Sequence, residues 1–426
     1  MTILSTIPQL DSYCRDVADR AKRAARQMAS LSTAIKNQWL LHAADALVAN
    51  ESALLDANAI DLSKADEYGL TSAERERLKL TKERIAQIAS GLREVAALAD
   101  PVGEVIEGSR RPNGLEIQKT RVPLGVLFFI YESRPNVTAD AAAIAIKSGN
   151  AIILRGGKEA IHSSQKIVEC LRESASVCKL PLDALQMVAT TDREAVGHFL
   201  KMSDAIDLVI PRGGEALIRR VVAEATMPVL KHYDGNCHVY VDRHADLEMA
   251  LSIVENSKCQ RMGVCNAMES LLVHRDVADL FLPQLDQRLR AYNIEYRGDA
   301  DCRRLIPATI SASDADWSLE YLGPTMSVKV VGSLDEAIDH IEQYSSRHTE
   351  SIVTNCIQSA DRFVREIDSA AVMINASTRF NDGGQLGMGA EIGISTDKFH
   401  ARGPCGLREL TTYKFIVRGN GHIRAN

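Results

Sequence analysis

The sequence lacks the patterns that most often mark a metal site or a disulfide scaffold. Its 426 residues contain no CxxC pair and no HExxH segment, which are common spacings of zinc ligands. The nine cysteines are odd in number and irregularly spaced, which argues against a disulfide framework. We therefore expect no metal and reduced thiols, each of them either a packing residue or a nucleophile.

Long apolar runs and a strong net charge are missing as well. The most apolar run, 126–131 (VLFFIY), is far too short to cross a bilayer, and residues 1–16 lack the basic-then-apolar build of a signal peptide. The net charge of −6 is small for this length. These absences predict a cytoplasmic protein of two or three domains that binds neither nucleic acid nor a membrane.

Nucleotide fingerprints are absent too, because no GxGxxG follows the early strands and no GK[ST] occurs. Two other stretches, LRGGKEA (154–160) and IPRGGEAL (210–217), each join a strand end, a Gly-Gly pair and a helix start, which suits phosphate. Either stretch alone would fit a tight turn with solvated basic residues equally well. The residues that would hold a cofactor there are Arg155, Lys158, Arg212, Gly213 and Gly214.

What is present is mostly regular structure. Residues 9–98 predict consecutive helices, and two series of strands alternating with helices predict two doubly wound parallel α/β sheets. Thr191 and Glu194 predict a capping box at one of these helices. The expected strands are 125–132, 151–156, 185–190 and 207–211, then 238–242, 269–274, 326–331, 350–354 and 371–377.

Residues 103–121 alternate around a Pro-Asn-Gly turn and predict a hairpin. The alternating strand 411–424 is a candidate to pair with that hairpin in a separate piece that joins copies of the chain.

Two cysteines lie six positions apart, at Cys259 and Cys265. Asn266 helps Cys265 to suit an accessible loop, as a nucleophile requires, whereas Lys258 beside Cys259 favours a thiolate there. Cys405, in a glycine-rich loop, is a candidate on the same grounds. Local chemistry leaves packing and catalysis open for all three.

Three long stretches carry a resemblance to a known family. They read FIYESRPNVTADAAAIAIKSGNAIILRGGKEA (129–160), VVGSLDEAIDHIEQYSSRHTESI (330–352) and GAEIGISTDKFHARGPCGLRELTTYK (389–414). The chain resembles, over nearly its whole length, the γ-glutamyl phosphate reductases of proline biosynthesis, which are glutamate-5-semialdehyde dehydrogenases of the aldehyde dehydrogenase superfamily. The resemblance implies reduction of L-glutamyl 5-phosphate to L-glutamate 5-semialdehyde and phosphate, with NADPH and through a cysteine thioester.

The resemblance also implies an aldehyde dehydrogenase-like fold, in which the chain is divided into three parts. These are an NADP-binding domain of 1–102 and 122–228, a catalytic domain of 229–407 and an oligomerisation flap of 103–121 and 408–426. It implies a homodimer or homotetramer and suggests a glutamate 5-kinase as a partner.

Roles of single residues follow from the resemblance in the same way. Cys265 takes the position of the superfamily's nucleophile and Asn136 that of its oxyanion-hole asparagine, so Cys259 becomes a structural residue. Glu320 corresponds to the glutamate at the nicotinamide ribose, and Arg155 lies near the adenosine ribose, where a 2′-phosphate favours NADPH over NADH. The residues expected to bind the anionic substrate are Arg134, Asn266, His348 and Arg402, with His348 fitting a hydrogen-bonded loop histidine equally well.

One departure from the superfamily bears on the reaction. Hydrolytic aldehyde dehydrogenases carry a Glu-Leu-Gly-Gly segment whose glutamate activates water, whereas residues 231–238 here read KHYDGNCH. Without that base the thioester should escape hydrolysis and exchange with phosphate. This argues against a hydrolytic aldehyde dehydrogenase, and the presence of Cys265 and Asn136 argues against an inactive scaffold.

Overall fold

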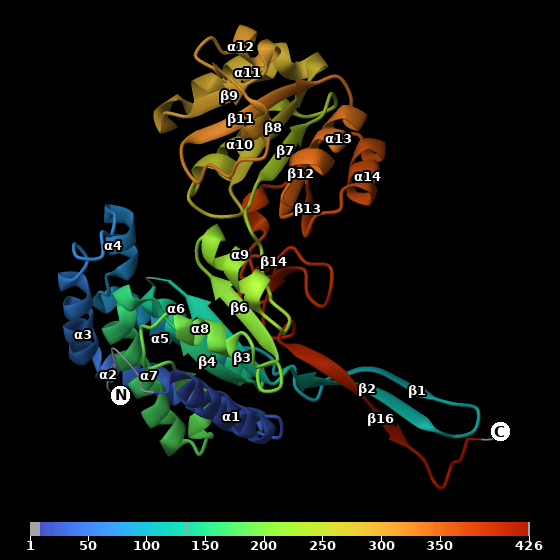
Figure 1. Ribbon diagram of the computed structural model, residues 1–426. Helices are drawn as coiled ribbons and strands as arrows, with labels where there is room; N and C mark the ends of the chain where they lie inside the picture. The colour runs from blue at the N-terminus through green and yellow to red at the C-terminus, as the bar shows by residue number, and fades with distance from the viewer. Residues whose placement is uncertain (1–8, 133, 425–426) are drawn as a thin grey trace. The chain divides into compact units, whose positions relative to one another are not determined.

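The computed structural model describes residues 9–132 and 134–424, and the chain divides into two compact units (Figure 1). The first unit holds the chain up to residue 231 together with 388–393 and 405–426, and the second holds 232–387 and 394–404. Residues 1–8, on which the expectation of no signal peptide partly depends, lie outside the described part.

The first unit opens with consecutive helices, as predicted. They are α1 (Leu10–Met28), α2 (Thr33–Ala49), α3 (Glu51–Ser63), α4 (Ser72–Leu78) and α5 (Lys82–Ala97). In α1 the buried side chains Val17, Ala21 and Met28 share one face at helical spacing. The short α4 begins with a capping box, in which the Thr71 N–H donates to Glu74 Oε2 at 2.8 Å.

A four-stranded parallel sheet follows in the order β5-β4-β3-β6. Its strands are β3 (Val126–Tyr131), β4 (Ala151–Arg155), β5 (Leu185–Met187) and β6 (Leu208–Arg212), with helices α6 (Pro135–Lys147), α7 (Ile161–Val177), α8 (Glu194–Phe199) and α9 (Glu215–Glu224). The predicted strands are confirmed. The predicted capping box is wrong, because the Glu194 N–H donates to Asp192 Oδ1 (2.9 Å) and the helix is capped at Arg193 without a side-chain bond.

Three strands form a separate antiparallel sheet. They are β1 (Val105–Arg110), β2 (Glu116–Pro123) and β16 (Thr411–Arg418), in the order β1-β2-β16. Figure 1 shows β16, at the red end of the chain, lying beside β2, and the register runs from Thr411 opposite Pro123 to Arg418 opposite Glu116. The pairing of the last strand with the hairpin is thus confirmed.

The second unit contains a parallel sheet in the order β10-β9-β11-β8-β7-β12-β13. Its strands are β7 (Cys237–Val241), β8 (Met268–His274), β9 (Glu295–Gly298), β10 (Ile310–Ser311), β11 (Thr325–Val331), β12 (Thr349–Val353) and β13 (Ala371–Ile374). Its helices are α10 (Leu247–Cys259), α11 (Arg275–Leu289), α12 (Ala300–Leu305), α13 (Leu334–Tyr344) and α14 (Ile357–Glu366). The five predicted strands are confirmed, and β9 and β10 were not predicted because they are short.

Strand alternation divides the core of the second unit between the two faces of this sheet. Val239 and Val241 of β7 pack with α10 and α11, whereas Tyr240 packs with α13 and α14. Both faces are covered by helices, so the doubly wound arrangement predicted from the sequence is confirmed.

The remaining elements are short. They are η1 (Lys158–Ala160), η2 (Leu182–Ala184), η3 (Arg290–Tyr292), η4 (Asp314–Trp317), η5 (Thr378–Phe380), β14 (Gly393–Ser395) and β15 (Gly403–Cys405). Among the described residues, no helix combines the length and the apolar character that crossing a bilayer requires.

Candidate active site

Cys265 lies on the loop that joins α10 to β8 in the second unit. Asp246 caps the start of α10 by accepting from the Met249 N–H (3.0 Å), and all seven residues of β8 are buried. The loop is therefore held at both ends, while the Cys265 side chain itself is half-buried and can be reached.

The segment 231–238 packs directly against the main chain of Cys265. A Cβ atom on Gly235 would stand 1.9 Å from the Cys265 carbonyl oxygen, so only glycine fits there. The Gly235 N–H donates to Glu320 Oε1 at 2.9 Å, and the Cys237 thiol donates to the Cys265 carbonyl oxygen at 3.2 Å. Glu320 thus lies close to the loop that carries Cys265, while its role toward a ribose stays a prediction.

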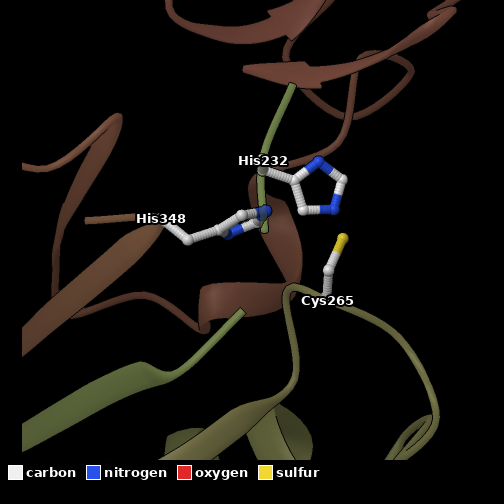
Figure 2. A group of neighbouring side chains, drawn as sticks. All are labelled: His232, Cys265 and His348. Atoms are coloured by element: carbon white, nitrogen blue, oxygen red, sulfur yellow. The ribbon is translucent and has the colours of Figure 1, made fainter. Parts of the chain in front are cut away.

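Two histidines point toward the sulfur of Cys265, as Figure 2 shows. The ligand-type atoms of His232, Cys265 and His348 all lie within 4.8 Å of one another. His232 Nδ1 is 3.0 Å from the Ile394 carbonyl oxygen, which fixes the orientation of this ring. Sequence reasoning missed His232, because the superfamily carries an acid, and not a histidine, in the corresponding segment.

His348 is completely buried at the start of β12, with its ring 5.5 Å from that of His232. Its Nδ1 lies 2.8 Å from Thr349 Oγ1, and its Nε2 has no hydrogen-bond partner among the described residues. Burial, and secondarily His232, lowers the pKa of His348 to about 3. His348 therefore offers a neutral imidazole, where we expected a cation for the substrate.

The other two candidate cysteines differ from Cys265. Burial raises the pKa of Cys259 to about 11 and outweighs the lowering effect of the Lys258 ammonium, which is itself buried in an ion pair with Glu269. Cys405 is fully buried. Both observations favour packing roles for these thiols, and Cys265 is the candidate that combines access with polar neighbours.

A cation that sequence reasoning missed lies near Cys265. Arg379, in η5 just after β13, is close enough to Cys265 and Arg261 for their charges to act on it, although burial is the main cause that lowers its pKa. Its Nε donates to Gln260 Oε1 at 2.9 Å. Its place beyond the carboxyl end of a parallel strand was a usable signal, since ligands gather there.

Two predicted substrate residues of the second unit are engaged within the protein. The Asn266 amide donates to the carbonyl oxygens of Asn381 (3.0 Å) and Arg379 (3.4 Å), so it holds the segment that carries Arg379. Arg402 Nη1 donates to Asp368 Oδ1 at 2.6 Å. Contact of either residue with substrate stays a prediction.

In the first unit, Arg134 and Asn136 lie at the start of α6, where Arg134 is the N-cap. Both are exposed, and the Asn136 amide donates to Asp140 Oδ2 at 3.1 Å. Burial raises the pKa of Asp140 to about 6, and the Asn136 bond opposes that shift. The oxyanion role of Asn136 and the substrate role of Arg134 stay predictions.

The second Gly-Gly turn already binds an anionic group of the same unit. Gly213 and Gly214 follow Arg212 at the end of β6, and the Gly214 N–H donates to Glu132 Oε2 at 3.2 Å. A Cβ atom on Gly213 would stand 2.5 Å from the Glu132 carboxyl carbon. The Gly214 N–H at the start of α9, a ten-residue helix, thus donates to a carboxylate oxygen, as it would to a phosphate oxygen.

The first Gly-Gly turn is built differently. Arg155 is buried at the end of β4, and its guanidinium donates to the carbonyl oxygens of Gly156 and Thr191. Burial lowers the pKa of Arg155, and its Nε has no hydrogen-bond partner among the described residues. Lys158 is exposed, with its ammonium 4.4 Å from the centre of the Tyr68 ring. This turn fits a phosphate less directly than the second.

Comparison with known proteins gives consistent matches. The model of the aldehyde dehydrogenase family matches residues 3–316. A protein of Rhodopirellula baltica named γ-glutamyl phosphate reductase is 62% identical over 415 residues, which cover 97% of this chain and 96% of that protein. One of Clostridium novyi with the same name is 52% identical over 415 residues, covering 97% and 100%.

A solved structure agrees with these relatives. The crystal structure of γ-glutamyl phosphate reductase from Thermotoga maritima is 45% identical and matches with a TM-score of 0.95, covering 97% of this chain and 100% of that chain.

Proposed function

The chain belongs to the aldehyde dehydrogenase family, and on that premise we propose that it reduces L-glutamyl 5-phosphate to L-glutamate 5-semialdehyde and phosphate with NADPH. Its likeness to γ-glutamyl phosphate reductases supports a reductase role in proline biosynthesis. The observation that carries the mechanism is the reachable Cys265, held by a rigid loop beside His232 and His348.

Cys265 acts as the nucleophile. Its thiolate attacks the γ-carbonyl carbon of the substrate, a carbon–sulfur bond forms, and the bond to the phosphate oxygen breaks, so that phosphate leaves and a thioester remains. The positive charge of Arg379, which interacts with Cys265, favours the thiolate and offers a partner for the anionic substrate. The thioester carbon would then be reduced by hydride from bound NADPH to a thiohemiacetal, whose collapse breaks the carbon–sulfur bond, returns the thiolate and releases the aldehyde.

The charge on the oxyanion needs two donors. The Cys265 main-chain N–H is the first, and we keep Asn136 as the second on the resemblance alone. Loss of one such donor typically lowers kcat roughly 10²–10³-fold. Asn136→Ala should fall in this range with little change of KM, and an unchanged kcat would remove Asn136 from the mechanism.

The cofactor fits the first unit at the second Gly-Gly turn. NADPH, when bound, supplies the hydride. The amides at Gly213 and Gly214 would hold its phosphates in place of the Glu132 carboxylate, with Arg212 at the same strand end. Lys158 and Arg155 are proposed to bind the adenosine part of NADPH. The Arg155 Nε, which has no hydrogen-bond partner among the described residues, is available as a donor there.

We also propose that copies of the chain associate through the sheet of β1, β2 and β16, as a homodimer or homotetramer. Tyr413, Phe415 and Val417 alternate along β16 and are 48%, 62% and 54% exposed. Such an apolar row on an exposed strand favours a protein partner. Phe415→Glu should then lower the mass measured by light scattering, and an unchanged mass would contradict this arrangement.

A glutamate 5-kinase, which makes an acyl phosphate of this kind, is the proposed supplier of substrate.

One observation favours the alternative function, that of a hydrolytic aldehyde dehydrogenase. Although segment 231–238 contains no glutamate, the His232 imidazole lies beside the sulfur of Cys265, and an imidazole can activate water. The reverse reaction separates the two functions. With glutamate 5-semialdehyde and NADP⁺, a phosphorylating enzyme should form NADPH only when phosphate or arsenate is present. Full activity without either anion would establish hydrolysis and overturn our proposal.

A further inference from the structure

We propose that His232, Cys265 and His348 form a binding site for a thiophilic divalent metal of the Zn²⁺ or Cd²⁺ class, and that a bound ion switches the enzyme off by capping its nucleophile. The three ligand atoms come from distant parts of the second unit and converge within 4.8 Å of one another. Figure 2 shows both rings directed toward the sulfur.

In each histidine, the ring nitrogen that would not bind the metal contacts a protein oxygen. Contacts of this kind orient most histidine ligands of metals. His232 Nδ1 meets the Ile394 carbonyl oxygen at 3.0 Å, and in Figure 2 the other ring nitrogen points toward the sulfur. His348 Nδ1 lies 2.8 Å from Thr349 Oγ1. His348 Nε2 is fully buried and without a hydrogen-bond partner among the described residues, which is costly unless a ligand satisfies it.

The chemistry of the ligands selects the metal. A thiolate and two neutral imidazoles suit Zn²⁺ and its softer relatives, whereas Mg²⁺ and Ca²⁺ require oxygen ligands, which this group lacks. Bonds of about 2.3 Å to sulfur and about 2.0–2.1 Å to nitrogen place the ligand atoms of a tetrahedral site roughly 3.5 Å apart. Small side-chain rotations would bring the group from its present spacing to that geometry, with water as the fourth ligand.

Two features limit the affinity. Arg379, close enough for its charge to interact with Cys265, opposes a second positive charge. Three protein ligands also bind less tightly than the four of a structural zinc site. We therefore expect reversible binding at about micromolar Zn²⁺ rather than a permanent metal.

The consequence for activity rests on the proposed function. Binding replaces the thiol proton of Cys265, which is released to solvent, by a sulfur–metal bond, and the lone pair that would attack the substrate is then occupied. No oxidation or reduction occurs, so a chelator should restore activity completely.

The first test measures binding without substrate. Metal-free, fully reduced enzyme is titrated with Co²⁺, whose thiolate charge-transfer band reports a cobalt–sulfur bond, and Zn²⁺ is then used to displace it. Wild type and His198→Gln, a control at a half-buried histidine of the first unit, should bind one Co²⁺ with the band. Cys265→Ser should lose the band, and His232→Gln and His348→Gln should each weaken binding at least about tenfold.

If His348→Gln fails to fold, the half-buried His232 still decides the matter. If His232→Gln binds Co²⁺ with the affinity of wild type and still shows the band, the metal is bound by the thiolate alone and the three-ligand site is wrong. The absence of any band in wild type would also overturn the site.

The second test follows the thiol itself. Zn²⁺ should protect Cys265 from iodoacetamide, as seen by mass spectrometry, and leave the half-buried Cys356, the N-cap residue of α14, unprotected. Equal protection of both cysteines would contradict a specific site. Binding that depends on all three residues but leaves activity intact would support the metal site and overturn the proposed role of Cys265. Zn²⁺ inhibition that is unchanged in His232→Gln and His348→Gln would overturn the metal site, while the proposed role of Cys265 as the nucleophile would remain.

Discussion

Cys259 and Cys265 are close in sequence but occupy two very different regions. Cys259 ends α10 and packs against the core of the second unit, and burial holds its pKa at about 11. Cys265 lies on the loop beyond, close to two histidines. The lysine next to Cys259 in sequence is bound to Glu269 inside the protein. Charge counts along the sequence therefore mislead here, because burial of the Cys259 thiol outweighs the effect of the neighbouring ammonium.

The strongest test of this contrast replaces each sulfur in turn. Cys265→Ser should lower kcat at least about 10³-fold, because a serine hydroxyl stays protonated at neutral pH and is a far weaker nucleophile than a thiolate. Cys259→Ser should stay within about twofold of wild type. Steady-state NADPH oxidation with acyl phosphate measures both. Retention of activity in Cys265→Ser would refute the nucleophile assignment.

The second test removes the charge that seemed to favour Cys259. Lys258→Met leaves the Glu269 carboxylate buried without its cation, and should lower the free energy of unfolding by about 3 kcal/mol. Burial raises the pKa of Glu269 to about 6, so partial protonation keeps the loss at the low end. Urea denaturation followed by circular dichroism measures it.

Glu269→Gln in the same chain is the matched rescue. Glutamine can still accept the bond that the Leu322 N–H donates to Glu269 Oε1 (3.2 Å), but it carries no charge. Most of the lost stability should return in Lys258→Met/Glu269→Gln. A double variant no more stable than Lys258→Met would show that packing, and not the unpaired charge, caused the loss.

The third test disturbs the loop that carries Cys265 without touching the sulfur. Gly235→Ala forces the Cys265 main chain to move, since the new methyl would stand 1.9 Å from its carbonyl oxygen. A displacement of about 1 Å can lower kcat roughly 10²-fold. Gly263→Ala is the control in the same loop, because its methyl would meet only the Leu322 carbonyl oxygen at 3.7 Å. Similar kcat values for the two variants would show that the position of this loop matters little.

Much of the fold could be predicted, because buried parallel strands such as β3 and β4 are short, almost continuous apolar runs. Strand β16 could be predicted for another reason, because its apolar and polar residues alternate like those of the hairpin with which it pairs. The strands β9 and β10 are too short for periodicity to detect.

The candidate site could be predicted only in part. Cys265 and Glu320 came from resemblance, and the structure places both beside segment 231–238. His232 and Arg379 lie near Cys265 but belong to segments far away in sequence, so no motif around Cys265 pointed to them, and only the position of Arg379 just beyond β13 offered a signal. The neutral state of His348 is a consequence of burial, which depends on tertiary packing.

The smallest expected effect concerns Cys259 as a packing residue. Cys259→Ala should leave kcat and KM unchanged and lower the free energy of unfolding by about 1 kcal/mol at neutral pH. The pKa of about 11 in the folded state lies above the ordinary value of the thiol, so the folded state disfavours the thiolate. The stabilising effect of Cys259 is thus complete below about pH 8.5 and declines as the pH rises toward 11. Unfolding of wild type and Cys259→Ala at several pH values measures this, and a difference that grows above pH 9 would mean that the folded protein binds Cys259 as a thiolate after all.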